Sequence, residues 1–151
     1  MRHTVFILLI SALLGTAACS NDSSSPTSPS TTLNLTGTYA GDITVQGAPA
    51  RMVWTVTQTG NAVTGSVVVS LPSGTVLLNG AVSGTVTGTS IAYTIIVSPG
   101  GIPAQPACGG QLSGTATGTT TAPFTLSGNY NLVSSTCTSP LTSGTFALTR
   151  P

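Results

Sequence analysis

The sequence predicts an all-β domain in which eight antiparallel strands close into an up-and-down β-barrel. Three observations support this fold class. Apolar and polar residues alternate with a period of two through most of the chain after Gly37, and the strand-forming residues Thr and Val are abundant. Glycine recurs on the apolar face of these segments. Short turns also alternate with longer loops along the chain.

The first half of the domain contains four predicted strands. In each of them the apolar face is formed by every second residue, because side chains alternate across a strand. The apolar faces are Tyr39, Gly41, Ile43 and Val45 in the first strand, Met52, Trp54 and Val56 in the second, Val63, Gly65, Val67 and Val69 in the third, and Val76, Leu78, Gly80, Val82 and Gly84 in the fourth.

The second half contains four more strands with the same alternation, of which the sixth is the weakest. The apolar faces are Ile91, Tyr93, Ile95 and Val97 in the fifth strand, Leu112, Gly114 and Ala116 in the sixth, Phe124, Leu126, Gly128, Tyr130 and Leu132 in the seventh, and Phe146 and Leu148 in the eighth.

The glycines on the apolar faces favour a closed barrel over the alternative, a β-sandwich. A glycine inside a strand marks a sharp bend or a close approach of backbones. Inward glycines at intervals curl a sheet until it closes. Closure also removes exposed sheet edges, which the few charged residues of this chain could not protect.

The connections predict two different ends of the barrel. In an up-and-down order the longer loops share one end, which we call the rim. The tight turns and both termini of the domain share the other end. The expected rim loops are 46–50, 71–74, 98–107 and 134–140, and the expected tight turns are 58–61, 87–89 and 117–121. The 98–107 loop is the strongest candidate for recognition because it is long and rich in Pro and Gly.

Two cysteines fall at the expected rim. Cys108 begins the sixth strand and Cys137 follows the seventh, so they lie on neighbouring strands. The N-terminal export signal described below makes an oxidising compartment the expected location of the domain. Two cysteines with no His form a poor metal site. We therefore predict a structural disulfide between them and no metal site.

Charged residues are nearly absent once residues 1–18 are removed. The remaining chain has no His, Lys or Glu, and its charged side chains are Asp22, Asp42, Arg51 and Arg150. Acid–base and nucleophilic catalysis need a positioned base or a group that titrates near neutrality. The composition therefore predicts a non-enzymatic protein without a cofactor, and the absence of a basic patch disfavours nucleic-acid binding. Asp42 and Arg51 are expected to form an exposed ion pair.

The N-terminus is typical of an export signal. A basic start precedes an apolar run from Val5 to Leu14 and small residues up to Ala18. With Cys19 next, the segment resembles the lipobox of bacterial lipoproteins, although Thr16 replaces the usual Leu. The resemblance implies cleavage after residue 18 and lipidation of Cys19, and Ser20 implies sorting to the outer membrane. An ordinary secretory signal that leaves a free thiol is the alternative.

Residues 19–33 are expected to tether the domain to the membrane. The segment is rich in Ser, Thr and Pro and has no apolar periodicity, so it cannot bury enough surface to fold. As a coil it would reach roughly 20 Å. The sequence thus divides into a signal peptide (1–18), a lipidated tether (19–33) and a barrel domain (34–151) in the bacterial cell envelope. It does not distinguish a domain that faces the periplasm from one on the cell surface.

The domain also resembles the calycin group, which includes lipocalins. Gly37-x-Tyr39 opens the first strand and Arg150 ends the last, as Gly-x-Trp and a packed Arg do in lipocalins. The resemblance covers about residues 36–151. It implies that Arg150 packs on Tyr39 at the closed end, and that the barrel binds a small, often apolar molecule.

The inward aromatic residues are the candidate ligand-lining set. Trp54, Tyr93 and Tyr130 could form a pocket below the rim, with Met52 and Leu132 nearby. Two functions follow from the two possible interiors. A hollow barrel is a lipid-anchored binding module for a small uncharged or apolar ligand. A filled barrel leaves a structural or protein-interaction lipoprotein.

Overall fold

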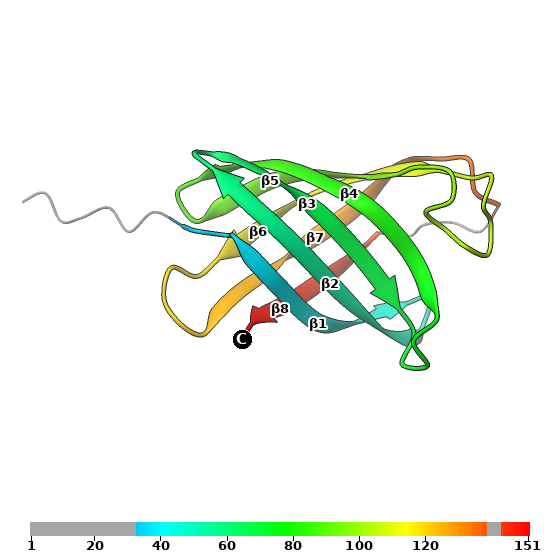
Figure 1. Cartoon of the computed structure of the whole chain (residues 1–151), viewed down its shortest axis with the longest axis horizontal. Helices are drawn as coiled ribbons and strands as arrows, with labels where there is room; N and C mark the ends of the chain where they lie inside the picture. Colours follow the sequence, from blue (N-terminus) through cyan, green and yellow to red (C-terminus); the bar gives the residue numbers. More distant parts are fainter. Residues whose placement is uncertain (1–32, 139–142) are drawn as a thin grey trace, which may run out of the picture. The chain divides into compact units, whose positions relative to one another are not determined.

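The structure is a computed structural model that describes residues 33–138 and 143–151. They form the predicted closed barrel, in which eight antiparallel strands are each hydrogen-bonded to their neighbours in sequence and β8 returns to β1 (Figure 1). The sandwich alternative is therefore wrong. The strands are β1 (Gly37–Val45), β2 (Ala48–Thr59), β3 (Ala62–Ser70), β4 (Val76–Thr87), β5 (Ser90–Val97), β6 (Gly110–Gly118), β7 (Phe124–Ser135) and β8 (Gly144–Arg150).

The two ends of the barrel differ as the loop lengths predict. The start of β1, the C-terminus and the β2–β3, β4–β5 and β6–β7 connections share one end, the closed end (Figure 1). The β3–β4 and β5–β6 loops lie at the rim. One rim connection is shorter than expected. Instead of a loop over 46–50, Gln46 and Gly47 form a two-residue turn with positive φ at both positions, as type I′ hairpins require.

The inward glycines occur where neighbouring strands approach most closely. A Cβ on Gly65 would lie 2.1 Å from the carbonyl oxygen of Thr55, and one on Gly114 would lie 1.9 Å from that of Asn129. No larger residue fits such a contact, so these glycines allow the sheet to curl tightly. Gly41, Gly80, Gly84 and Gly128 also have atoms of a neighbouring strand at less than 3 Å from an added Cβ.

Residues 33–36, which precede β1, pack into the closed end of the barrel. Leu33 and Leu35 are 1% and 2% exposed. The side chain of Gln58 holds this segment, since its Oε1 accepts from the amide of Leu35 at 2.9 Å and its Nε2 donates to the carbonyl of Leu33 at 3.0 Å. Leu33, placed by composition at the end of the tether, therefore belongs to the core. A lone Leu beside a Ser/Thr-rich stretch has no periodicity that could reveal this.

Arg150 packs on two aromatic rings at the same end. Its guanidinium carbon lies 4.0 Å from the ring centroid of Phe124 and 5.4 Å from that of Tyr39. The guanidinium also donates a hydrogen bond to the carbonyl of Thr36. Gly37 leaves the necessary room, because its φ is 144° and a Cβ there would lie 2.6 Å from Cδ of Arg150. The structure thus brings Gly37, Tyr39 and Arg150 together.

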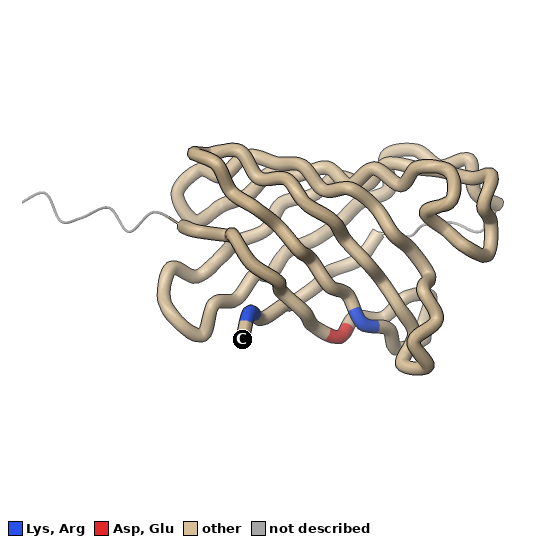
Figure 2. Tube along the Cα trace, in the orientation of Figure 1, with Lys and Arg blue, Asp and Glu red and all other residues tan. Residues whose placement is uncertain are grey.

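Charged residues are few along the described part of the chain (Figure 2). Asp42 and Arg51 lie opposite each other on β1 and β2 and form the expected ion pair, with 3.7 Å between Oδ1 and the guanidinium. Both side chains are exposed, so the pair contributes little to stability.

Candidate ligand-binding cavity

Three aromatic rings form a layer across the middle of the barrel. The centroid of Trp54 lies 4.9 Å from that of Tyr93 and 5.2 Å from that of Phe146, and the Tyr93–Phe146 distance is 6.2 Å. These residues come from β2, β5 and β8, so the contacts join strands that are not hydrogen-bonded neighbours in the barrel. The indole N–H of Trp54 has no hydrogen-bond partner in the described part of the chain.

The barrel is hollow in its rim half. A cavity of about 530 Å³ lies toward the rim loops. It is lined mostly by aliphatic side chains from the rim half of the strands and by the loops above them. The lining residues are Ile43, Val45, Gln46, Met52, Val67, Val69, Thr75, Val76, Leu77, Leu78, Ile95, Ile102, Pro103, Ala104, Gln105, Leu112 and Tyr130.

The polar groups of the lining are few and uncharged. Gln46, Thr75 and Gln105 belong to rim connections, whereas Tyr130 lies on β7. No charged side chain is among the lining residues. An isolated charge would lose its hydration here without gaining a counter-charge, so the cavity suits a neutral, mainly apolar molecule.

The β5–β6 loop forms part of the cavity wall. Its Ile102 is 8% exposed and lines the cavity together with the three residues that follow. The amide of Asn79 on β4 donates to the carbonyl of Gly101 at 2.7 Å, which fixes the loop to the barrel. On the other side of the loop, Oε1 of Gln105 accepts from the amide and the hydroxyl of Thr138.

A disulfide holds the end of this loop. Cys108 and Cys137 are bonded as predicted, with their Cα atoms 4.9 Å apart. The amide of Gly109 donates to the hydroxyl of Thr136 beside the bond. The 98–107 loop is therefore held to the segment that follows β7 both covalently and by hydrogen bonds.

The five residues predicted to line a ligand pocket have three different positions. Met52 and Tyr130 line the cavity. Trp54 and Tyr93 are buried in the aromatic layer, and Leu132 is partly buried against the core, so none of these three is a lining residue. The prediction centred on three inward aromatic residues, of which Tyr130 lines the cavity, whereas Trp54 and Tyr93 pack with Phe146 in the middle of the barrel.

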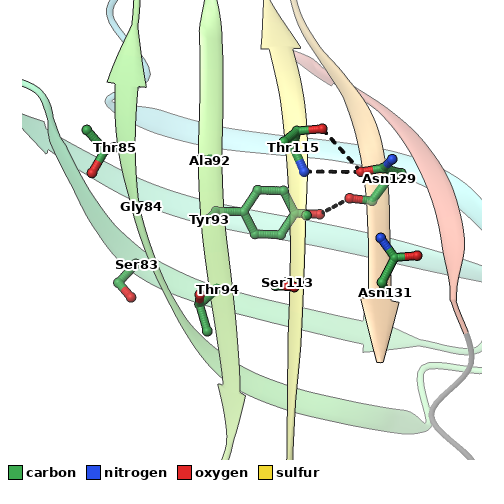
Figure 3. Close-up of a pocket in the computed structure, with 11 residues that line it drawn as sticks. Ser83, Gly84, Thr85, Ala92, Tyr93, Thr94, Ser113, Thr115, Asn129 and Asn131 are labelled. Carbon is green, nitrogen blue, oxygen red and sulfur yellow. Dashed lines mark hydrogen bonds between the residues drawn. The ribbon is translucent and has the colours of Figure 1, made fainter. Parts of the chain in front are cut away.

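The side chain of Tyr93, on β5, is hydrogen-bonded to the backbone of β7. Its hydroxyl crosses above Gly114 and donates to the carbonyl of Asn129 at 2.6 Å (Figure 3). The side-chain Oδ1 of Asn129 in turn accepts from the amide of Thr115 at 3.1 Å. Burial raises the pKa of Tyr93 well above its usual range, and the nearby Tyr130 raises it further. The phenol therefore remains a hydrogen-bond donor at neutral pH.

A second concavity lies on the outer face of β4–β7 (Figure 3). Its polar side chains stand in register across the strands and are all uncharged. They are Ser83, Thr85, Thr94, Ser113, Thr115, Asn129 and Asn131. This groove is broadly open, so water competes there for every hydrogen bond. The interior cavity is less open and more apolar, so it is the stronger candidate site.

Comparison with known protein families, with curated proteins and with solved structures finds no match. Within residues 33–138 and 143–151, no three His, Cys, Asp or Glu side chains are grouped so that they could hold a metal ion. The same residues include no helix long and apolar enough to cross a bilayer. The fold and cavity define the class of the protein: a closed eight-stranded up-and-down β-barrel that is hollow at one end.

Proposed function

We propose that this protein is a non-catalytic binding module that holds a small, uncharged and mainly apolar molecule in the rim half of its barrel. The cavity of about 530 Å³ supports the proposal. Small-molecule pockets have volumes of roughly 300–1,000 Å³ and are lined mainly by apolar side chains. The alternative, a structural or protein-interaction role with a filled core, needs no such space.

The closed half of the barrel provides a rigid base for the cavity. The side chains of Leu33, Tyr39, Leu126 and Leu148 are each only 1% exposed and fill that half. Since this half is filled, the cavity opens toward the rim loops that line it, at the end of the barrel opposite Leu33.

Binding of a neutral apolar dye, N-phenyl-1-naphthylamine, tests this function. We expect the mature protein to bind one dye per barrel, with energy transfer from Trp54, the only Trp of the chain. Val69→Phe adds a ring inside the cavity and should weaken binding at least about tenfold, since the added side chain occupies ligand space. Native mass spectrometry of the purified protein would show whether a ligand is retained.

Val68→Phe is the matched control, because Val68 lies on the same strand with its side chain on the outer face. It should leave dye binding unchanged. Equal binding by the wild type and Val69→Phe, or equal loss in both variants, would contradict a ligand site inside the barrel.

We also propose that the module is anchored to the cell envelope, in the outer membrane, by a lipid on Cys19. The signal-like segment before Cys19 and the Ser/Thr/Pro-rich segment after it support this proposal, and both lie outside the described residues. The full chain produced in a bacterium should partition into detergent and carry acyl groups on its N-terminal peptide by mass spectrometry. Cys19→Ala should lose both properties. An unmodified wild-type N-terminus would disprove anchoring without affecting the barrel's proposed ligand.

A further inference from the structure

Tyr130 differs from the other strand residues of the cavity wall because its side chain ends in a hydroxyl. The residue is 7% exposed and lines the cavity from β7. Gly144 lies directly opposite it on β8. A Cβ at position 144 would lie 2.4 Å from the Tyr130 hydroxyl, so the absence of a side chain there gives the phenol its place.

The hydroxyl of Tyr130 forms no hydrogen bond with any residue that the structure describes. The hydroxyl of Tyr93, in contrast, donates to the carbonyl of Asn129. The Tyr130 hydroxyl still has contact with solvent, since among the described residues the fully buried side-chain polar atom without a partner is Nε1 of Trp54. A wholly apolar ligand would displace this water and leave the phenol without a hydrogen bond, which is unfavourable. A polar atom of a bound molecule would remove this penalty.

The remaining polar groups of the lining lie at the mouth. Gln46 and Thr75 are in rim connections, and Oε1 of Gln105 already accepts two hydrogen bonds from Thr138. Tyr130 is thus the residue with a polar group on the strand part of the cavity wall, where the other lining residues, such as Leu112 and Ile95, are apolar.

We propose that the Tyr130 hydroxyl is the polar anchor of the cavity, and that the ligand is a neutral, mainly apolar molecule with a hydroxyl or carbonyl oxygen bonded to it. This inference rests on the function proposed above. A phenol can both donate and accept, so it can bind either oxygen. A carboxylate would be buried here without a counter-charge. Burial also raises the pKa of Tyr130, which keeps the phenol protonated.

Displacement of the dye by three molecules of equal chain length tests the proposal: octanol, n-octane and octanoate. For the wild type at neutral pH, octanol should bind at least about tenfold more tightly than octanoate. Tyr130→Phe should weaken octanol binding about fivefold, the loss expected for one hydrogen bond. The affinity for n-octane should not change, because the alkane forms no hydrogen bond.

Each other outcome has a distinct meaning. Unchanged octanol binding in Tyr130→Phe overturns the anchor and leaves the apolar cavity intact. Tighter binding of octanoate than of octanol overturns the neutral head group. If neither the dye nor any of the three molecules binds the wild type, the proposed function itself fails.

Tyr93→Phe is the matched control, since it removes a buried hydroxyl that is already bonded and does not line the cavity. It should leave octanol binding unchanged. If Tyr130→Phe does not fold, Gly144→Ala provides the second variant. Its Cβ displaces the Tyr130 hydroxyl and should weaken octanol but not octane. Equal loss of octanol binding in Tyr93→Phe would overturn the assignment to Tyr130.

Discussion

Arg150 and Arg51 show how different the surroundings of two identical side chains can be in one small barrel. Arg150 lies against the rings of Phe124 and Tyr39 and bonds to the Thr36 carbonyl. Arg51 is 57% exposed and faces Asp42 across solvent. In a chain with so few charges, the first arginine is a structural residue of the closed end and the second is a surface group.

Replacement of these arginines should therefore have unequal effects. Arg150→Ala should lower the free energy of unfolding by about 1–3 kcal/mol, because it removes cation–π contacts and a charge-assisted hydrogen bond. Arg51→Ala should change it by less than about 0.5 kcal/mol, as exposed ion pairs contribute little. Urea denaturation of both variants measures the difference, and equal losses would contradict a special role for Arg150.

Among the glycines that the structure describes, Gly114 has the least space for a side chain. An added Cβ would lie 1.9 Å from the carbonyl oxygen of Asn129 and 2.7 Å from the hydroxyl of Tyr93. Gly114→Ala should thus destabilise the barrel by about 3 kcal/mol, at the upper end of the usual effect of overpacking. Ser113→Ala, next to it on the outer face, should change stability by no more than about 0.5 kcal/mol. Thermal unfolding by circular dichroism gives both values, and a neutral Gly114→Ala would mean that the strands can move apart.

At the scale of elements, the β5–β6 loop depends on its attachment to the segment that follows β7. The Cys108–Cys137 bond, the Gln105–Thr138 bonds and the Asn79–Gly101 bond fix it at both sides. Ile102, Pro103 and Ala104 form part of the cavity wall only while this loop stays in place. The loop is therefore the element through which stability and ligand binding are connected.

Reduction of the disulfide should weaken both properties. Its sequence separation is 29 residues, for which loop closure contributes about 3–4 kcal/mol in the chain-entropy model. A reductant should lower the wild-type stability by this amount and also lower dye affinity. The Cys108→Ser, Cys137→Ser double variant should start at the reduced values and not respond to reductant. A response in the double variant would show that the reductant acts elsewhere.

At the scale of the whole molecule, the few titratable groups make stability nearly independent of pH over a wide range. Burial raises the pKa of Tyr39, Tyr93 and Tyr130, and the charge of Arg150 partly opposes this for Tyr39. The folded chain thus holds phenolic protons more tightly than the unfolded chain, whose tyrosines titrate near pH 10. The stabilisation is complete below that pH and is lost above it.

We expect the free energy of unfolding to be flat between about pH 5 and 9, since the chain after Cys19 has no His, Lys or Glu. Above about pH 10 it should fall by roughly 1.4 kcal/mol per pH unit for each tyrosine that stays protonated in the fold. Denaturation midpoints across pH, with tyrosinate absorbance recorded in parallel, test this. A decline that begins near neutrality would contradict it.

The sequence predicts most of the fold because the relevant signals are local. Alternation sets which residues of a strand face inward, and the inward glycines indicate closure. Cys108 and Cys137 could be paired because both lie at the ends of neighbouring strands. The predicted loop over 46–50 between β1 and β2 was wrong. Pro49 is a residue typical of loops, but in the structure it lies within β2, which begins at Ala48. No local pattern in the sequence indicates that Leu33 belongs to the core.

An all-β barrel with two unlike ends, a disulfide at the rim and hardly any charge can be predicted from the amino-acid sequence, since each of these depends on short-range patterns. Whether the rim half is hollow or filled depends on tertiary packing. Trp54, Tyr93 and Phe146 meet across the barrel from three separate strands and fill its middle. The smaller side chains toward the rim cannot meet across the same width, so a cavity remains with Tyr130 on its wall. Such space is set by side chains distant in sequence, and no local pattern records it.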